Sequence, residues 1–189
     1  LAYLTHEIPS LRTVRLFDIR PEAIARLAAE AASYFDGEIV ACATLEECIS
    51  GADIISTCTA GSEQVVRPEW FVPGAFAVGI EGGCAFTADA LQSADKFVVD
   101  DVELVEYFDR IGQDRFTEDG EPDPEFPGGL PNIYATIGQI VTGRKPARDS
   151  VDERIVATPI GMSSCDVGLT KLVYETARER GIGSQFRLA

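Results

Sequence analysis

The sequence contains few of the side chains on which common enzyme mechanisms depend. Its 189 residues include a single histidine, His6, and a single methionine, Met162. One histidine near the start of the chain leaves little room for histidine-dependent catalysis, and we expect His6 to lie on a helix surface. The motifs G-x-S-x-G and H-E-x-x-H and a complete Walker motif are also absent. Their absence removes the common hydrolase and nucleoside-triphosphatase classes.

Cysteine is present, but not in a pattern that binds metal or builds a disulfide framework. The five cysteines form no C-x-x-C pair and are widely spaced. Their odd number also argues against a disulfide framework. We therefore expect reduced thiols that pack mostly in the core, no metal site, and a cytoplasmic location.

Basic residues are scarce relative to acidic ones. The sequence has 16 Lys and Arg against 31 Asp and Glu, a formal net charge of −15. Such a surface repels phosphate backbones and anionic lipids, so we expect neither nucleic-acid nor membrane partners. No apolar run approaches the ~20 residues that a bilayer span needs. Acidic residues gather between residues 100 and 125, and we expect residues 113–130 to form either a solvated surface loop or a lid over a site.

What the sequence does contain is a regular alternation of short apolar runs and helical patterns. Such alternation is typical of right-handed βαβ units, and it predicts an α/β fold with a doubly wound parallel sheet. The expected strands cover residues 14–17, 38–42, 52–57, 75–80, 96–99 and 154–160. One expected helix begins at Pro21, and further helices are expected over 45–50, 87–93, 102–111, 132–142 and 164–180.

Ligands of such folds bind at the carboxyl ends of the strands, and Asp18 is the first polar residue at such an end. A carboxylate there can accept hydrogen bonds from the adenosine ribose, about 20 residues after a glycine-rich turn. It can equally serve a turn or a helix cap. Counting back about 20 residues passes Leu1, and the only methionine is Met162, so we expect a fragment rather than a processed chain. Arg20 either contacts the adenine end of a nucleotide or is simply solvated.

Two further strand ends carry polar or small residues. Thr57, Cys58 and Thr59 precede Gly61, and this segment either lets the backbone approach a ribose or phosphate or forms a plain turn. Glu81 follows an apolar strand and is flanked by glycines. Partial desolvation in the crevice above the sheet would favour its protonated form, which suits a general acid or base. The alternative is an ordinary glutamate in a surface turn.

Several segments, read in order, carry a family resemblance. They are V-R-L-F-D-I-R (14–20), G-A-D-I-I (51–55) with T-C-T (57–59), P-G (73–74) followed by A-V-G (77–79), I-G-Q-I (137–140) and Y-E (174–175). In this order and spacing they resemble the ornithine cyclodeaminase/mu-crystallin family of dinucleotide-dependent proteins. The resemblance runs over nearly the whole chain.

The resemblance implies a Rossmann-type dinucleotide-binding domain over residues 1–163 that lacks its first strand and glycine-rich turn. Residues 164–189 would be a helix and tail that return towards an N-terminal substrate and dimerisation half absent from this chain. It implies a homodimer and NAD rather than NADP, because a carboxylate at Asp18 repels a 2′-phosphate. The residues expected at the cofactor are Asp18, Ile19, Arg20, Thr57, Cys58, Thr59 and Val78.

The implied activity is that of an NAD(P)-dependent oxidoreductase. It would move a hydride between nicotinamide and the α-carbon of an amino or imino acid, with deamination as a possible accompaniment. Glu81 stands where the family has a catalytic aspartate and is one methylene longer. The alternative is a non-catalytic, mu-crystallin-like protein that keeps the dinucleotide pocket as a binding or accessory protein.

Overall fold

The computed structural model describes residues 1–61, 63–82, 85–105, 130–184 and 186. The acidic loop expected over 113–130 falls outside this part of the chain except for Leu130. The helix expected over 102–111 is described only as far as Val105. The choice between a lid and a solvated loop is therefore untested.

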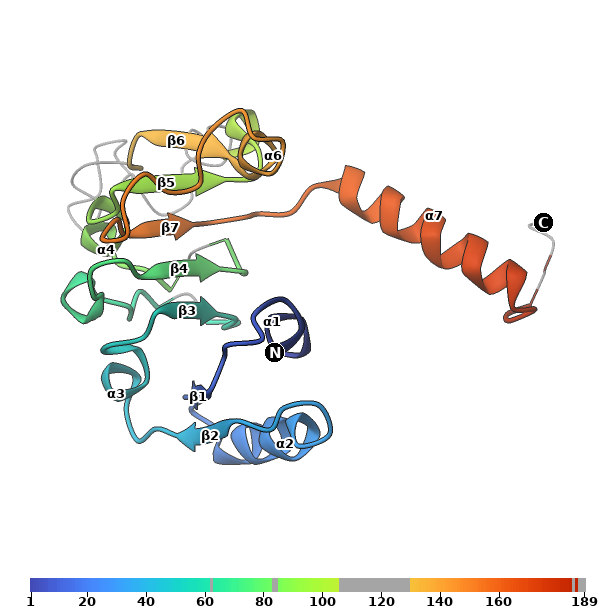
Figure 1. The fold of residues 1–189 in the computed structure, drawn as a ribbon, viewed down its shortest axis with the longest axis horizontal. Coiled ribbons are helices and arrows are strands. Elements are labelled where there is room, and N and C mark those ends of the chain that lie inside the picture. Colours follow the sequence, from blue (N-terminus) through green and yellow to red (C-terminus); the bar gives the residue numbers. More distant parts are fainter. Residues whose placement is uncertain (62, 83–84, 106–129, 185, 187–189) are drawn as a thin grey trace, which may run out of the picture.

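Parallel strands form the centre of the fold (Figure 1). The strands are β1 (Thr13–Leu16), β2 (Glu38–Ala41), β3 (Ile54–Thr57), β4 (Phe76–Gly79), β5 (Lys96–Val99), β6 (Ile133–Thr136) and β7 (Ile155–Ala157). β1 and β2 pair with each other, and the remaining strands form a five-stranded sheet in the order β3-β4-β7-β5-β6. Every pair in both sheets is parallel. The α/β fold with a parallel sheet is thus confirmed.

Helices lie in connections between strands, as parallel pairing requires, and also before the first strand and after the last one. They are α1 (Ala2–Glu7), α2 (Pro21–Ala31), α3 (Leu45–Ile49), the 3₁₀ helix η1 (Pro68–Trp70), α4 (Ala88–Gln92), α6 (Ile137–Val141) and α7 (Ser163–Glu179). Local sequence sets several starts. Pro21 occupies the first turn of α2, and the side chains of Thr44 and Thr87 accept backbone N–H bonds at the starts of α3 and α4.

The core lies on the five-stranded sheet, in which β5 and β7 are apolar except for Lys96 at the start of β5. All four residues of β5 and all three of β7 are buried. Phe86, Phe97 and Val99 are among the largest fully buried side chains, and Phe71 packs edge-on against Phe86 with ring centroids 6.2 Å apart. Continuous apolar strands are expected where a parallel sheet is covered on both faces.

The prediction of a helix over residues 132–142 is wrong for the first half of that range. Residues Ile133–Thr136 form strand β6, and only Ile137–Val141 are helical. Thr136 and Gln139 form a capping box: the Thr136 hydroxyl accepts from the Gln139 N–H at 3.2 Å, and the Gln139 side chain accepts from the Thr136 N–H at 3.0 Å. The box starts the helix at Ile137, and pairing with β5 takes up the preceding residues.

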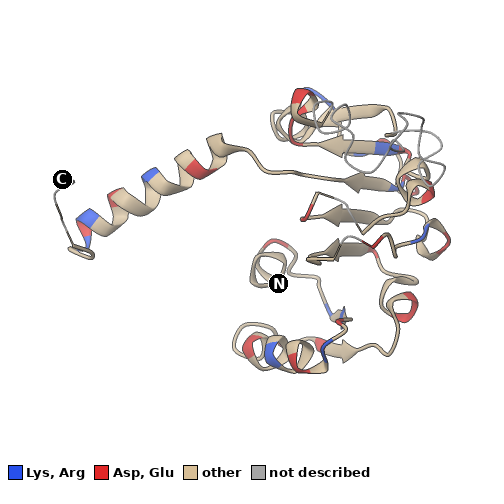
Figure 2. Cartoon of the chain, turned by 180° about the vertical axis from the view of Figure 1, so that it is seen from behind, with Lys and Arg blue, Asp and Glu red and all other residues tan. Residues whose placement is uncertain are grey.

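Helix α7 reaches away from the sheet, and its last turn lies farthest from β7 (Figure 1). None of its residues is buried, and the exposed side chains include Leu169, Leu172 and Tyr174. Charged residues are spread along its length (Figure 2). The helix expected over 164–180 is confirmed to within one residue at each end.

At the amino ends of the strands, the segment before β7 is fastened to the turn before β4. The Arg148 guanidinium donates to the carbonyl oxygens of Gly74 at 3.0 Å and Val151 at 3.3 Å, and also to that of Glu153. Gly74 has φ +81°, and a Cβ there would lie 2.4 Å from the Val151 oxygen. Only glycine allows the two segments to approach so closely.

Lys96 adds a charged cluster at the same end of the sheet. Its side chain is only 5% exposed, and its ammonium lies 2.7 Å from Asp149 and 3.2 Å from Glu153. Burial works against the charged form of Lys96, but the two carboxylates outweigh it and raise the pKa of the ammonium. The Asp149 N–H donates to the Glu153 carboxylate at 2.8 Å and lowers the pKa of Glu153. Lys96 lowers this pKa further, whereas burial acts in the opposite direction.

We expect Arg148→Ala in the intact protein to reduce the free energy of unfolding by about 2–4 kcal/mol, because partly buried carbonyl groups lose a charged donor. Chemical denaturation measures this change. Arg144→Ala, at an exposed position four residues earlier, is the matched control and should change stability by less than about 0.5 kcal/mol. Equal effects of the two substitutions would contradict the anchoring role of Arg148.

The Lys96–Glu153 pair also predicts a pH dependence. The pKa of Glu153 is lowered from 4.5, so its stabilisation is present above pH 4.5 and is lost as pH falls through the folded-state value. The pKa of Lys96 is raised from 10.5, so its stabilisation persists below pH 10.5. In unfolding titrations, the stability difference between wild type and Glu153→Gln should therefore be flat between these values and shrink at the acid end. A difference that stays constant into the acid range would refute the pairing.

Candidate functional site

The carboxyl ends of β3 and β4 bring Thr57 and Glu81 into contact. The two strands pair in register, with Thr57 opposite Gly79. The Ile80 N–H continues the pairing by donating to the Thr57 carbonyl at 3.1 Å. The Thr57 hydroxyl then donates to Oε1 of Glu81 at 2.7 Å, and both side chains are partly buried. Parallel pairing of β3 and β4 therefore brings together two side chains that the sequence places at separate strand ends.

A tight turn after β4 sets the position of Glu81. The Gly82 N–H donates to the Gly79 carbonyl at 3.1 Å, and Gly82 has φ +85°. Other residues adopt this left-handed conformation only with strain. A Cβ on Gly82 would lie 4.0 Å from the Ile160 side chain, so the conformation rather than lack of space calls for glycine. Glu81 therefore projects from a constrained turn.

The loop after β3 is exposed and bonded mainly within itself. The Thr59 hydroxyl accepts from the Gly61 N–H at 3.0 Å, and the Ser56 hydroxyl lies 3.7 Å from the Cys58 sulfur. Val78 lies inside β4, opposite Ser56 and next to the apolar cluster that includes Ala157. These contacts give the loop a defined shape, while a cofactor role for Cys58, Thr59 and Val78 stays a prediction.

Asp18, Ile19 and Arg20 lie together after β1, on the two-stranded sheet rather than beside Glu81. The Asp18 carboxylate accepts from the Arg20 N–H at 2.8 Å, and the Arg20 side chain lies 3.6 Å from it. Asp18 thus fills the turn that leads into α2, one of the roles considered for it. Its side chain is still 36% exposed and Ile19 is 88% exposed, so both remain accessible to a ligand.

Asp100 is a buried carboxylate that the sequence analysis did not select. It follows β5 directly and is 8% exposed. Its oxygens accept from the N–H of Gly161 at 2.5 Å and of Asp101 at 3.0 Å. Gly161, with φ +104°, lies in the segment between β7 and α7. Asp100 therefore attaches this connecting segment to the carboxyl end of the sheet. The signal that could have found it is the rule that led to Asp18 and Glu81: a carboxylate directly after an apolar strand.

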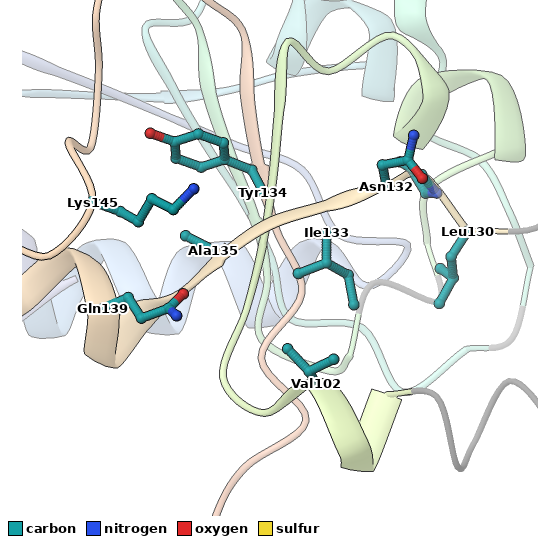
Figure 3. A pocket seen from close by; sticks show the side chains of 9 residues that line it. Val102, Leu130, Asn132, Ile133, Tyr134, Ala135, Gln139 and Lys145 are labelled. Atoms are coloured by element: carbon teal, nitrogen blue, oxygen red, sulfur yellow. The ribbon is translucent and has the colours of Figure 1, made fainter.

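A hollow of about 570 Å³ lies elsewhere, along strand β6 (Figure 3). Leu130, Tyr134, Gln139 and Lys145 are among its lining residues. The Lys145 ammonium lies 4.9 Å from the centre of the Tyr134 ring, a cation–π distance. Because β6 and β3 are opposite edges of the five-stranded sheet, this hollow is separate from the Thr57–Glu81 pair.

Two other features are absent from the described residues. No group of three or more His, Cys, Asp or Glu side chains in this part of the chain could hold a metal ion. None of the helices described is both long and apolar enough to cross a membrane.

Comparison with known proteins identifies a family match along nearly the whole chain. Residues 2–181 match the sequence model of the ornithine cyclodeaminase/mu-crystallin family. Alanine dehydrogenase of Archaeoglobus fulgidus is 29% identical over 178 residues, covering 92% of this chain and 52% of the relative. Ketimine reductase mu-crystallin of Rattus norvegicus is 31% identical over 147 residues, covering 77% and 42%. The chain thus spans about half the length of the curated relatives it matches.

Solved structures share the fold. An archaeal alanine dehydrogenase dimer with bound NAD superposes with a TM-score of 0.77 at 23% identity, covering 97% of this chain and 55% of the other. Thermococcus litoralis Δ1-pyrroline-2-carboxylate reductase, in complex with NADH and L-proline, gives 0.76 at 20% identity, covering 97% and 56%. The shared fold therefore extends over nearly the whole of this chain.

Proposed function

Because the chain belongs to the ornithine cyclodeaminase/mu-crystallin family, we propose that it is the dinucleotide-binding part of an oxidoreductase that acts on an amino or imino acid. Relatives named alanine dehydrogenase and Δ1-pyrroline-2-carboxylate reductase support this class of reaction. The single observation that carries the proposal is the Thr57–Glu81 pair, at the strand ends where ligands of such sheets bind.

The residues at these strand ends fit a dinucleotide. Asp18 presents a partly exposed carboxylate after β1, suited to ribose hydroxyl groups. The exposed residues 58–61 that follow Thr57 offer the Thr59 hydroxyl and a backbone that can be approached closely. Structural neighbours hold NAD or NADH. We assign NAD in preference to NADP, because the Asp18 carboxylate would repel a 2′-phosphate.

The bound nicotinamide would supply or accept a hydride. Reduction of a carbon–nitrogen double bond also requires a proton on nitrogen, and oxidation of an amine requires its removal. We assign this proton transfer to the Glu81 carboxyl group, which the Gly79–Gly82 turn and Thr57 hold in one direction. Partial burial of Glu81 keeps bulk water from competing for the proton.

We also propose that the chain divides into a cofactor domain and a segment that reaches a substrate domain. Residues 1–163 would form the cofactor domain, with its first strand and glycine-rich turn upstream. Residues 164–189 would reach a substrate domain and the dimer interface, which suits the exposed apolar side chains of α7. The archaeal neighbour is a dimer, and we propose a cytoplasmic homodimer here.

Glu81→Gln in the intact protein tests this function. The amide cannot take up or release the proton, so turnover should fall by about 10²–10⁴-fold while NADH affinity is retained. The assay follows NADH oxidation with Δ1-pyrroline-2-carboxylate and with pyruvate plus ammonium, and calorimetry gives the NADH affinity. Glu69→Gln, at an exposed position in η1, is the matched control and should leave both values unchanged.

Two outcomes would count against the proposal. Undiminished turnover by Glu81→Gln would reject the role given to Glu81. Tight NADH binding by the wild type, with no turnover of any amino or imino acid tried, would favour the non-catalytic alternative.

A further inference from the structure

We propose that Thr57 is a positioning residue for Glu81, and that its hydroxyl group holds the Glu81 carboxylate at the end of β3 in the orientation required for proton transfer. This inference rests on the proposed function and deepens it. The sequence pattern assigned Thr57 to the cofactor, whereas the structure gives its hydroxyl a protein partner.

The geometry of the contact is that of a strong hydrogen bond. The Thr57 Oγ1 to Glu81 Oε1 distance of 2.7 Å is at the centre of the range for O–H···O bonds. Ionised acceptors shorten and strengthen such bonds, and partial burial limits competition from water. A threonine hydroxyl has one proton to donate, and here it goes to the carboxylate.

The backbone makes the contact a consequence of strand pairing. Thr57 lies opposite Gly79 in the β3–β4 ladder, and its carbonyl accepts from the Ile80 N–H at 3.1 Å. The turn closed by Gly82 then places Glu81 two residues past the end of β4. Both residues are therefore attached to adjoining parts of the same pair of strands. Because these backbones are hydrogen-bonded to each other, the separation of the two side chains changes little.

A glutamate at this position needs such a restraint. Its carboxylate is carried by a flexible side chain that loses rotamer freedom when it is held in one place. Proton transfer depends on donor and acceptor lying within hydrogen-bond reach in the reacting complex. By fixing one carboxylate oxygen, Thr57 limits the directions that the carboxylate can take before the substrate arrives. That restraint acts on the chemical step and leaves the cofactor contacts unchanged.

Thr57→Val and Thr57→Ser separate the hydroxyl from the shape of the side chain. Thr57→Val keeps the branched shape and removes the donor, and it should lower kcat by about 10–100-fold. Thr57→Ser keeps the donor and should retain most of kcat. The affinity for NADH, measured by calorimetry on the intact protein, should be the same in both variants as in wild type. A structural or cofactor-binding role alone would not give this separation.

Glu81→Asp provides the second arm. The aspartate is one methylene shorter and no longer reaches the Thr57 hydroxyl, so adding Thr57→Val to Glu81→Asp should change kcat by less than about twofold. Crystal structures of the intact wild type and Thr57→Val give a readout independent of turnover. The wild type should keep the 2.7 Å contact, and in Thr57→Val the Glu81 carboxylate should move or adopt several conformers.

The possible results distinguish the two proposals. If Glu81→Gln loses turnover but Thr57→Val does not, the positioning role is overturned while the proposed function stands. If Glu81→Gln keeps turnover, Glu81 does not transfer the proton, and the positioning role of Thr57 is overturned together with the role of Glu81. Three further results would each overturn the positioning role. Thr57→Val could lower kcat equally in the wild type and in the Glu81→Asp variant, or it could lower the affinity for NADH in parallel. The Glu81 carboxylate could also keep its position in the crystal structure of Thr57→Val.

Discussion

Parallel pairing of β3 and β4 is the constraint on which the candidate site depends. Parallel strands end at the same edge of a sheet, so side chains far apart in sequence meet there without any local motif. Thr57 and Glu81 are separated by 24 positions, yet the ladder and one short turn bring their side chains to hydrogen-bond distance. The chemistry proposed for Glu81 follows from that edge.

The two ends of the five-stranded sheet have different contacts. At the amino ends, Arg148 holds the segment before β7 with hydrogen bonds, and the nearly buried Lys96 holds it with ion pairs to Asp149 and Glu153. At the carboxyl ends, polar side chains lie within two residues of the strand ends: Glu81 meets Thr57, and Asp100 meets the backbone of Gly161. We interpret the first set as support for the fold and the second as the place where a ligand would bind.

Much of the architecture could be predicted from the sequence, because alternating apolar runs and helical patterns depend on burial along each element. The strand β6 could not, because Ile133–Thr136 run without a break into the helix over Ile137–Val141, and only pairing with β5 separates the strand from the helix. The partner of Thr57 and the burial of Asp100 were hidden for the same reason. A single sequence locates strand ends, but contacts between neighbouring strands depend on strand order, and β7 lies between β4 and β5.

The most direct test of the central claim is a crystal structure of the intact protein with NADH bound. The account predicts that the nicotinamide ring lies at the carboxyl ends of β3 and β4, next to Glu81. It also predicts that the Asp18 carboxylate accepts hydrogen bonds from the adenosine ribose at about 2.6–3.2 Å. A dinucleotide bound at the amino ends of the strands, or one that leaves Asp18 and Glu81 both out of contact, would contradict it.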